Sequence, residues 1–245
     1  MKNKRLVGLL VAACTLTSFQ VVADEQYHDF GFIGLGTTYG QSVFSKEGQA
    51  DFDVEPSIFY NGQYGFVDGG LVNVSLLPYL GLSGQWRFAE VSDDVTSLPN
   101  GINDRDGNGE LGITLGTVGA RLTYLHDFTD QHNGYEVQLH LGRAFDTFSE
   151  DFTLSPYVEV DYRDKRLSQH LYSVSATEAS ISGLNEFEAS DTFVYQAGVI
   201  GIYEISSNWL ALGKVHLEHH DSNSSIIQQD LGWNVSLSIN YKFTD

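Results

Sequence analysis

Residues 231–243 alternate without exception between apolar and polar side chains. Every odd position from Leu231 to Phe243 is aliphatic or aromatic, and every even position is Gly, Asn, Ser or Lys. A period of two is that of a β-strand, whose successive side chains point to opposite faces. The run is about twice as long as the usual strand of a globular protein, and it matches the roughly ten-residue strand of an outer-membrane barrel.

The same alternation recurs at 80–88, 135–142, 152–163 and 209–218. In each segment one face is apolar and the other carries charged side chains. A water-soluble β-sandwich would alternate in the same way, but these segments are long and carry Trp or Tyr near the ends of the apolar face, as an aromatic girdle does. The pattern therefore predicts an all-β chain that forms a single antiparallel transmembrane β-barrel.

Turn signals divide the chain into about twelve strands, or ten if the weakly marked segments are left out. Tight turns are expected at 61–62, 130–133 and 206–208, and longer polar segments at 41–50, 90–109, 146–150, 175–190 and 221–229. Short turns of such a barrel face the periplasm, longer loops face outward, and a periplasmic C-terminus requires an even strand number. The expected strands lie near 29–40, 50–61, 63–69, 70–76, 78–90, 109–127, 134–146, 150–163, 167–174, 191–205, 208–220 and 230–243, of which 63–69, 70–76 and 167–174 are the weakly marked ones.

The first 23 residues have the form of a secretory signal peptide. A short basic start is followed by the apolar segment 6–13 and by small residues that end at Ala23. Cleavage after Ala23 leaves residues 24–245 as the barrel domain, without a cysteine and hence without disulfide bonds. The alternative is a lipoprotein signal that presents Cys14 for lipidation.

The charge of the chain excludes several classes of protein. Lys and Arg number 13 against 32 Asp and Glu, a net charge of −19, which becomes −22 when the three basic residues of the signal are removed. No basic surface exists to neutralise phosphates, so a nucleic-acid partner is excluded. A helical membrane protein is excluded as well, because no apolar run of about 18 residues follows the N-terminal segment.

Several diffuse motifs cover almost the whole mature chain. They comprise a Gly-rich first strand (Gly31, Gly34, Gly36), the segments 42–48, 56–60 and 65–69, an acidic stretch at 104–106 followed by 110–112, the segments 172–175 and 178–179, and the closing 241–243. In these motifs the chain resembles the MipA/OmpV family of Gram-negative outer-membrane proteins, named after the MltA-interacting protein. It departs from the family by the Thr244-Asp245 extension and by a first strand without Pro.

The resemblance implies an outer-membrane barrel without catalysis of its own. Members similar to MipA are described as scaffolds that link a lytic transglycosylase to a murein synthase, and OmpV-like members are associated with adhesion and stress responses. The function expected from the resemblance is therefore that of a non-enzymatic scaffold of the cell outer membrane, with periplasmic murein enzymes as partners. A small cation-preferring channel and a surface adhesin or stress-response barrel are the alternatives.

Two groups of residues have the composition of metal sites. Residues 104–111 match the first eight positions of an EF-hand loop, which makes Asp104, Asp106, Asn108 and Glu110 calcium candidates; position 12, however, is Leu115, and no helix flanks the loop. A polar loop that enters a strand is the simpler interpretation. The second group comprises His216, Glu218, His219 and His220. A polar lumen wall is the simpler interpretation there too, since on a strand His219 would point away from the other three. We expect no cofactor.

The polar face of the expected strands supplies the candidate lumen residues. In a barrel of about twelve strands such charges pair across the interior or line a narrow water path, and an excess of acids would favour cations. The candidates are Glu55, Arg87, Glu136, His140, Glu159, Asp161, Arg163, Lys214, His216 and Glu218. No nucleophile elbow and no zinc-protease motif is present, and we expect no enzyme activity.

The remaining acids concentrate in the expected outer loops. Beside anionic lipopolysaccharide they would be repelled unless divalent cations bridge the two, so outer-membrane lipid and lipopolysaccharide are expected partners. These acids are Asp93, Asp94, Asp104, Asp106, Glu110, Glu150, Asp151, Glu186, Glu188 and Asp191.

Overall fold

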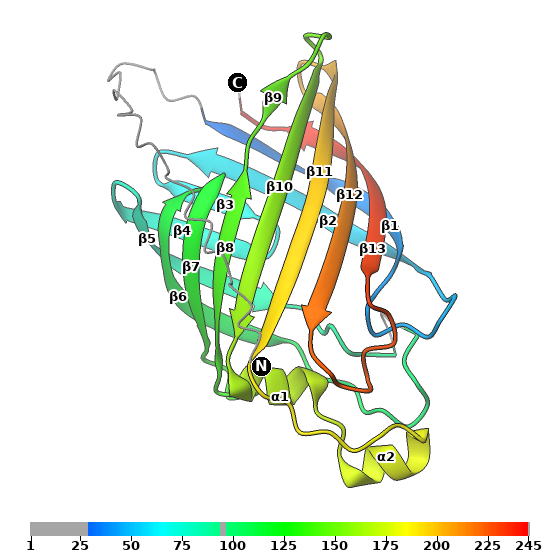
Figure 1. Ribbon diagram of the computed structural model, residues 1–245. Helices are drawn as coiled ribbons and strands as arrows, with labels where there is room; N and C mark the ends of the chain where they lie inside the picture. Colours follow the sequence, from blue (N-terminus) through cyan, green and yellow to red (C-terminus); the bar gives the residue numbers. More distant parts are fainter. Residues whose placement is uncertain (1–28, 94–96, 245) are drawn as a thin grey trace, which may run out of the picture.

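A computed structural model describes residues 29–93 and 97–244, and the expected signal peptide lies outside these residues (Figure 1). Twelve antiparallel strands close into a barrel. The strand bounds are β1 Phe30–Gln41, β2 Asp51–Gly62, β3 Gly65–Asp68, β4 Leu71–Leu77, β5 Leu80–Arg87, β6 Asn108–Thr117, β7 Ala120–Asp127, β8 Tyr135–Gly142, β10 Phe152–Arg163, β11 Thr192–Ser206, β12 Trp209–Asp221 and β13 Gly232–Lys242. A two-residue strand, β9 (Phe145–Asp146), extends β8 along β10. The barrel closes where β1 pairs with β13 over ten residue pairs, from Phe32↔Lys242 to Gln41↔Trp233.

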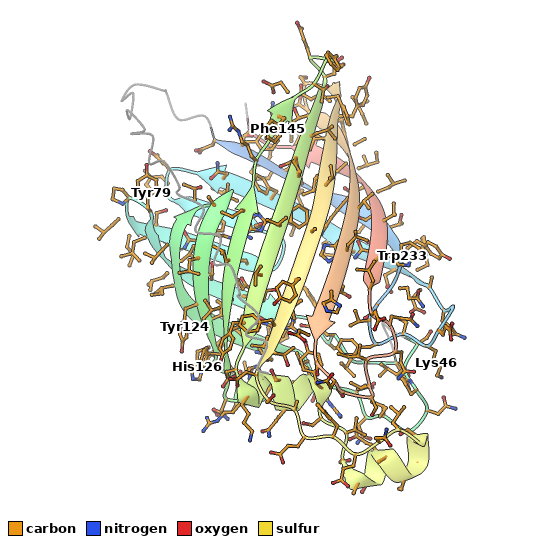
Figure 2. All side chains as sticks on the ribbon, in the orientation of Figure 1. Lys46, Tyr79, Tyr124, His126, Phe145 and Trp233 are labelled. Atoms are coloured by element: carbon orange, nitrogen blue, oxygen red, sulfur yellow. The ribbon has the colours of Figure 1, made fainter. Side chains whose placement is uncertain are left out.

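The side-chain alternation sorts residues between lipid and lumen. On β13 the odd positions Val235, Leu237 and Ile239 are exposed on the outside, whereas Asn240 is fully buried inside. Aromatic side chains lie near both ends of the wall, with Tyr124 and Trp233 at one end and Tyr79 and Phe145 at the other (Figure 2). This outer surface is that of an outer-membrane barrel. The chain contains no helix, within its described part, that is long and apolar enough to cross a membrane.

The two ends of the barrel differ in the length of their connections. Short links join strands at 63–64, 78–79, 118–119 and 207–208, and both Phe30 and Lys242 lie at this end, here called the turn end. The segment 143–151, which contains β9, also lies at the turn end, and the other long connections lie at the opposite end, the cap end. The described residues of the links 42–50, 88–93, 97–107, 128–134, 164–191 and 222–231 form the cap.

Two short helices belong to the cap. Helix α1 (Lys165–Tyr172) begins after Asp164, whose carboxylate accepts a hydrogen bond from the Leu167 amide. Helix α2 (Ala176–Ser182) begins with a capping box between Ser175 and Glu178 and ends at Gly183 in the left-handed conformation. The larger apolar cluster of the chain lies here rather than in the barrel, and it comprises Val43, Phe44, Val91, Leu98, Ile102, Leu167, Leu171, Tyr172, Val174, Ala189 and Ile226.

The predicted number of twelve strands is confirmed, but two of the predicted segments are wrong in compensating ways. Residues 109–127 form two strands, β6 and β7, joined at 118–119, and residues 167–174 form most of α1 instead of a strand. The tight turn expected at 130–133 lies at the cap end. The polar segment expected outside at 146–150 lies at the turn end, because β10 starts there.

Candidate functional site

The barrel encloses two adjoining cavities. The cavity next to the cap, called the upper cavity whatever the orientation of the figures, has a volume of about 580 Å³. The cavity toward the turn end, called the lower cavity, has a volume of about 610 Å³. Glu55, Asp68, Arg121, Glu159 and Gln196 line both, so the cavities meet at these residues. All ten lumen candidates lie along them. Glu55, Arg87, Glu136, Glu159, Asp161, Arg163 and Glu218 line the upper cavity, and Glu55, His140, Glu159, Lys214 and His216 line the lower one.

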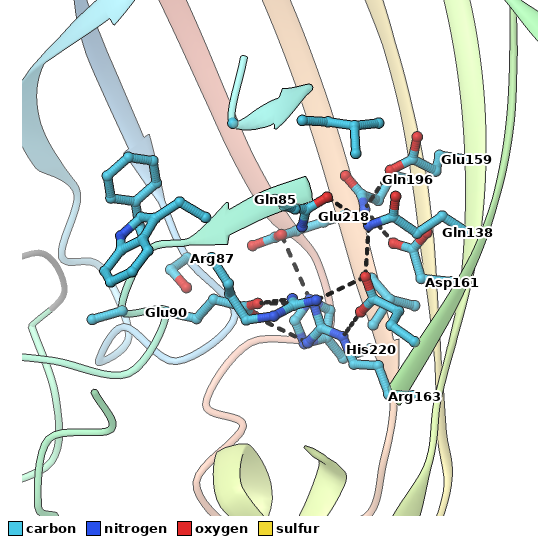
Figure 3. A pocket seen from close by; sticks show the side chains of 18 of the residues that line it. Gln85, Arg87, Glu90, Gln138, Glu159, Asp161, Arg163, Gln196, Glu218 and His220 are labelled. Carbon is cyan, nitrogen blue, oxygen red and sulfur yellow. Dashed lines mark hydrogen bonds and ion pairs between the residues drawn. The ribbon is translucent and has the colours of Figure 1, made fainter. Parts of the chain in front are cut away.

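Two arginines cross the cap end of the upper cavity and are held by buried carboxylates (Figure 3). Arg87 of β5 donates to Glu110 of β6, at 3.1 Å from its Nε, and to Glu136 of β8, at 2.9 Å from its Nη2. Arg163 of β10 donates from Nε to the second oxygen of Glu136 at 2.8 Å. Glu136 therefore joins the guanidinium group of its cross-strand neighbour Arg163 to that of Arg87 on β5.

The same two arginines attach the cap to the barrel wall. Glu90, just beyond β5, accepts from Arg87 Nη1 at 2.8 Å and from both terminal nitrogens of Arg163 at 2.9 Å. Burial acts to raise the pKa of Glu90, but Arg163 and Arg87 outweigh it and hold that pKa at about 2. Arg163 Nη1 also donates to the Tyr172 hydroxyl of α1 at 2.5 Å, and burial raises the pKa of this hydroxyl. We call Arg87, Glu90, Glu110, Glu136 and Arg163 the arginine clamp.

The lining of the upper cavity, the arginine clamp included, is acidic. Seven carboxylates line the upper cavity, from Glu55, Asp68, Glu90, Glu136, Glu159, Asp161 and Glu218, against the three guanidinium groups of Arg87, Arg121 and Arg163. Asp161 is only 1% exposed; its Oδ2 accepts from Gln196 Nε2 at 2.6 Å, but its Oδ1 is buried without a hydrogen-bond partner among the described residues. A buried carboxylate oxygen without a donor is costly, and this cost is relieved by a proton on the carboxyl group, by a water molecule, or by a cation in the cavity.

The junction and the lower cavity have a more balanced charge. Arg121 Nη2 lies 2.8 Å from Asp68 and 3.9 Å from Glu159, and Glu159 is also 2.6 Å from His140 Nδ1. Nearby, the Tyr157 hydroxyl lies 2.8 Å from His216 Nδ1. Lys214 Nζ lies 5.8 Å from the centre of the Tyr157 ring.

The four calcium candidates do not converge on one point. Asp104 accepts from the Asp93 amide at 2.8 Å in the exposed part of the cap. Glu110 is fully buried in the lumen, where Arg87 occupies both of its oxygens. Asn108 donates to the same Glu110 at 3.3 Å, and the Asp106 carbonyl lies 3.2 Å from His170. Among the residues that the structure describes, no group of three or more His, Cys, Asp or Glu side chains is arranged to hold a metal ion.

The histidines of β12 divide between the two faces of the strand. His216 and His220 point into the lumen, and His220 Nε2 lies 3.5 Å from Glu218. His219 is oriented away from them and lies 2.6 Å from the Asp230 carbonyl. His220 Nδ1 lies 3.1 Å from the Tyr172 hydroxyl, so this histidine contacts the cap.

Sequence reasoning missed five residues that complete the site. Gln138 donates to Glu136 at 2.7 Å, Gln196 holds Asp161, and Arg121 holds Asp68. All three lie on the polar face of their strands, which the alternation could have identified. Glu90 and Tyr172 have no such signal, because the first follows the end of a strand and the second lies in a helix.

A comparison with protein families finds a match over residues 33–243 to the family described as MltA-interacting protein MipA. The chain is 23% identical over 227 residues to YiaT of Escherichia coli K12, which is named as an outer membrane protein, and the match covers 86% of this chain and 90% of YiaT. Solved structures that it resembles include Neisserial surface protein A, with a TM-score of 0.31, 8% identity and coverages of 88% and 97%. Another is OmpT of Vibrio cholerae, with a TM-score of 0.35, 7% identity and coverages of 89% and 97%.

Proposed function

We infer the function from two facts: this chain belongs to the MipA family, and it forms an outer-membrane barrel. We propose that the barrel is non-enzymatic and that its acidic lumen binds small cations and lets them pass. The observation that carries the proposal is the unpartnered Oδ1 of Asp161, buried in a cavity with seven carboxylates and three guanidinium groups. A protonated amine or a small cation would supply the missing partner, and the surplus of acids would repel anions.

Passage through the cap end requires a change in the arginine clamp. Arg87 and Arg163 lie across the upper cavity, and the apolar cluster of the cap covers it. We expect the resting barrel to conduct weakly, with brief openings when Glu90 and the cap move away from the two arginines.

Planar-bilayer recordings test this function. Under a salt gradient the reversal potential of the wild-type protein should show cation preference, and the double variant Asp161→Asn with Glu159→Gln should lose a large part of it. The matched control is Glu186→Gln, which removes a carboxylate from an exposed position of the cap. Anion preference in the wild type, or no conductance under any condition, would contradict the proposal.

The scaffold function remains a second candidate, because the family is described by its interaction with MltA. The turn end, which we place in the periplasm, offers little contact surface except at 143–151, where the chain projects beyond its neighbours (Figure 1). Phe148 in this segment is fully exposed, and Phe145 is half exposed. A photo-crosslinking residue at Phe148 should capture a lytic transglycosylase or a murein synthase in cells, with Tyr64 as the control position. Failure to recover a murein enzyme would remove the scaffold function.

The acidic cap supports association with lipopolysaccharide through divalent cations, with the cap facing outward. Asp93, Asp104, Asp106, Glu186, Glu188 and Asp191 belong to the cap, and Asp94 lies outside the described residues. Glu110 is excluded from this set because it faces the lumen. Glu150 and Asp151 are excluded because they lie at the turn end. Addition of a chelator should weaken binding of lipopolysaccharide to the purified barrel, whereas anion repulsion alone predicts no change.

A further inference from the structure

The barrel wall is interrupted beside the short strands β3 and β4. Strand β3 pairs with β2 only over Phe59–Gly62, and the last bond on this side runs from the Gly69 amide to the Ile58 carbonyl at 3.2 Å. Among the described strands, none pairs with residues 51–57 of β2 on that side. On the far side of the interruption the β4–β5 ladder continues by one step, because the Trp86 amide of β5 donates to the Gly70 carbonyl at 3.2 Å.

Along the free edge of β2, the backbone N–H and C=O groups of every second residue point away from β1. Since the Ile58 carbonyl points toward β3, the N–H and C=O groups of Phe52 and Val54 and the C=O group of Pro56 point toward the same side. Pro56 lacks an N–H group, which fits an edge position and removes a donor that an added strand would need. The edge is therefore poorly suited to extension by another β-strand.

At the cap end, contacts between β2 and the cap close the interruption. Ser97 donates to Asp51 from both its amide, at 3.3 Å, and its hydroxyl, at 2.9 Å, and the Lys46 amide donates to the Ser97 carbonyl at 3.0 Å. The result is a window bounded by residues 52–57 of β2, the β3–β4 link at 69–70, residues 86–88 and Ser97. We call it the lateral window.

The inner and outer sides of the lateral window differ in chemistry. The register of β2 with β1 places Asp53 opposite Thr38 and Glu55 opposite Gly36, on the lumen side. On the outer side, Phe52 and Phe88 are 65% and 67% exposed, and Trp86 is 53% exposed. Glu55, Asp68, Gly70, Trp86 and Phe88 all line the upper cavity, so this cavity extends to both sides of the window.

Unpaired backbone groups at membrane depth are tolerated only where water or a ligand meets them. We propose that the lateral window binds a single-chain amphiphile with an ammonium head, whose head lies at Glu55 and Asp53 and whose chain lies on the outward aromatic side chains. The inference rests on the proposed cation function and adds a ligand class and a lateral route to it. A phosphate or sulfate head would be repelled by the same carboxylates.

Tryptophan quenching in phosphatidylcholine nanodiscs tests the proposal. The reporter variant keeps Trp86 and carries Trp209→Phe and Trp233→Phe; the control reporter keeps only Trp209, which is 49% exposed on the distant β12. The probes are terminally brominated dodecylammonium and brominated dodecyl sulfate. We expect the ammonium probe to quench Trp86 saturably at a concentration at least ~10-fold lower than the sulfate, the factor that about 1.4 kcal/mol of charge interaction gives. Trp209 should not distinguish the two heads.

Removing the carboxylates identifies their contribution. The double variant Asp53→Asn with Glu55→Gln should abolish the preference for ammonium at Trp86, while the matched control Asp146→Asn with Glu150→Gln, at the turn end, should keep it. Heat-modifiable mobility on gels verifies that each variant has folded. Equal, non-saturating quenching by both probes, or a dimer that pairs through β2, would overturn the proposal. If either result were found while the bilayer recordings still showed cation preference, the lateral window would be refuted and the proposed cation function of the lumen would stand.

Discussion

Replacing Glu90 with Gln should release the cap from the barrel wall without unfolding the barrel. Glu90 accepts three short hydrogen bonds from two arginines, at 2.8, 2.9 and 2.9 Å. Gln keeps one acceptor oxygen but loses the charge, and its NH₂ group faces two guanidinium groups. Arg87 and Arg163 keep Glu136, so the inner half of the arginine clamp remains.

The cost follows from charge-assisted hydrogen bonds, each worth roughly 1.5–3 kcal/mol when buried. The Glu90 side chain is 25% exposed, so the gross value is reduced by solvent screening. We expect about 2–4 kcal/mol in the equilibrium that opens the cap, which is a population change of about 30- to 1,000-fold.

Hydrogen exchange measured by mass spectrometry gives this change as faster exchange in peptides from 97–107 and 165–172. The control is Glu188→Gln. Glu188 lies 3.3 Å from Lys165, but the two side chains are 76% and 59% exposed, so the loss should be negligible. Exchange in Glu90→Gln that matches Glu188→Gln would refute the assignment of the arginine clamp as the attachment of the cap.

Four further outcomes are expected. Burial lowers the pKa of His132 to about 4, so its neutral form stabilises the loop 128–134 fully above the unfolded pKa near 6.5. The protection factors of this loop, which correct for the pH dependence of intrinsic exchange, should fall as pH falls from 6.5 toward 4. Burial acts to raise the pKa of Glu178, but its hydrogen bonds from Ser175, Asn103 and Arg105 hold it at about 2; α2 should therefore stay protected above pH 4.5 and lose protection as pH falls toward 2. Gly183→Ala, at φ 76°, should cost about 1 kcal/mol in the stability of the same helix, seen by exchange of 176–182. Leu237→Arg on the lipid face should cost about 2–4 kcal/mol in urea unfolding from liposomes, whereas a cap variant should leave that transition unchanged.

The sequence reveals the strands through the phase of their alternation, and the errors arise where the phase changes. Outward residues of β6 lie at odd positions such as Leu111 and Ile113, and those of β7 at even positions such as Leu122 and Tyr124. As one segment, 109–127 has apolar residues on both faces. As two strands with a link at 118–119, each half alternates regularly.

The helices of the cap were also visible in local signals. Ser175 followed three residues later by Glu178 is a capping box, and Asp164 precedes apolar residues Leu167 and Leu171 at helical spacing. The prediction of a strand at 167–174 is wrong because the apolar residues Leu167 and Leu171 follow helical spacing and belong to the cap, not to the barrel wall.

The contacts of the lumen depend on information that alternation does not hold. Alternation assigns a face to Arg87 and Arg163 but does not identify their partners. Arg163 meets Glu136 through the register of β8 with β10, and Arg87 reaches the same carboxylate from β5, three strands away from β8. Glu90 lies beyond its strand, and its partners come from β5 and β10. The lateral window likewise depends on where β3 stops, which the weak pattern of 63–76 does not determine.

The cap and the wall are stabilised by different physical terms, and this separates their responses to conditions. The wall buries its apolar side chains in lipid and pairs its described strands into a closed sheet around the barrel. The cap has its own apolar cluster, is held together internally by carboxylates such as Glu178, and is joined to the wall through Glu90. Since protonation removes the charge of these carboxylates but leaves the lipid-facing surface unchanged, strong acid should detach the cap while the barrel stays folded. A single transition of cap exchange and barrel mobility on acidification would show that the two form one cooperative unit instead.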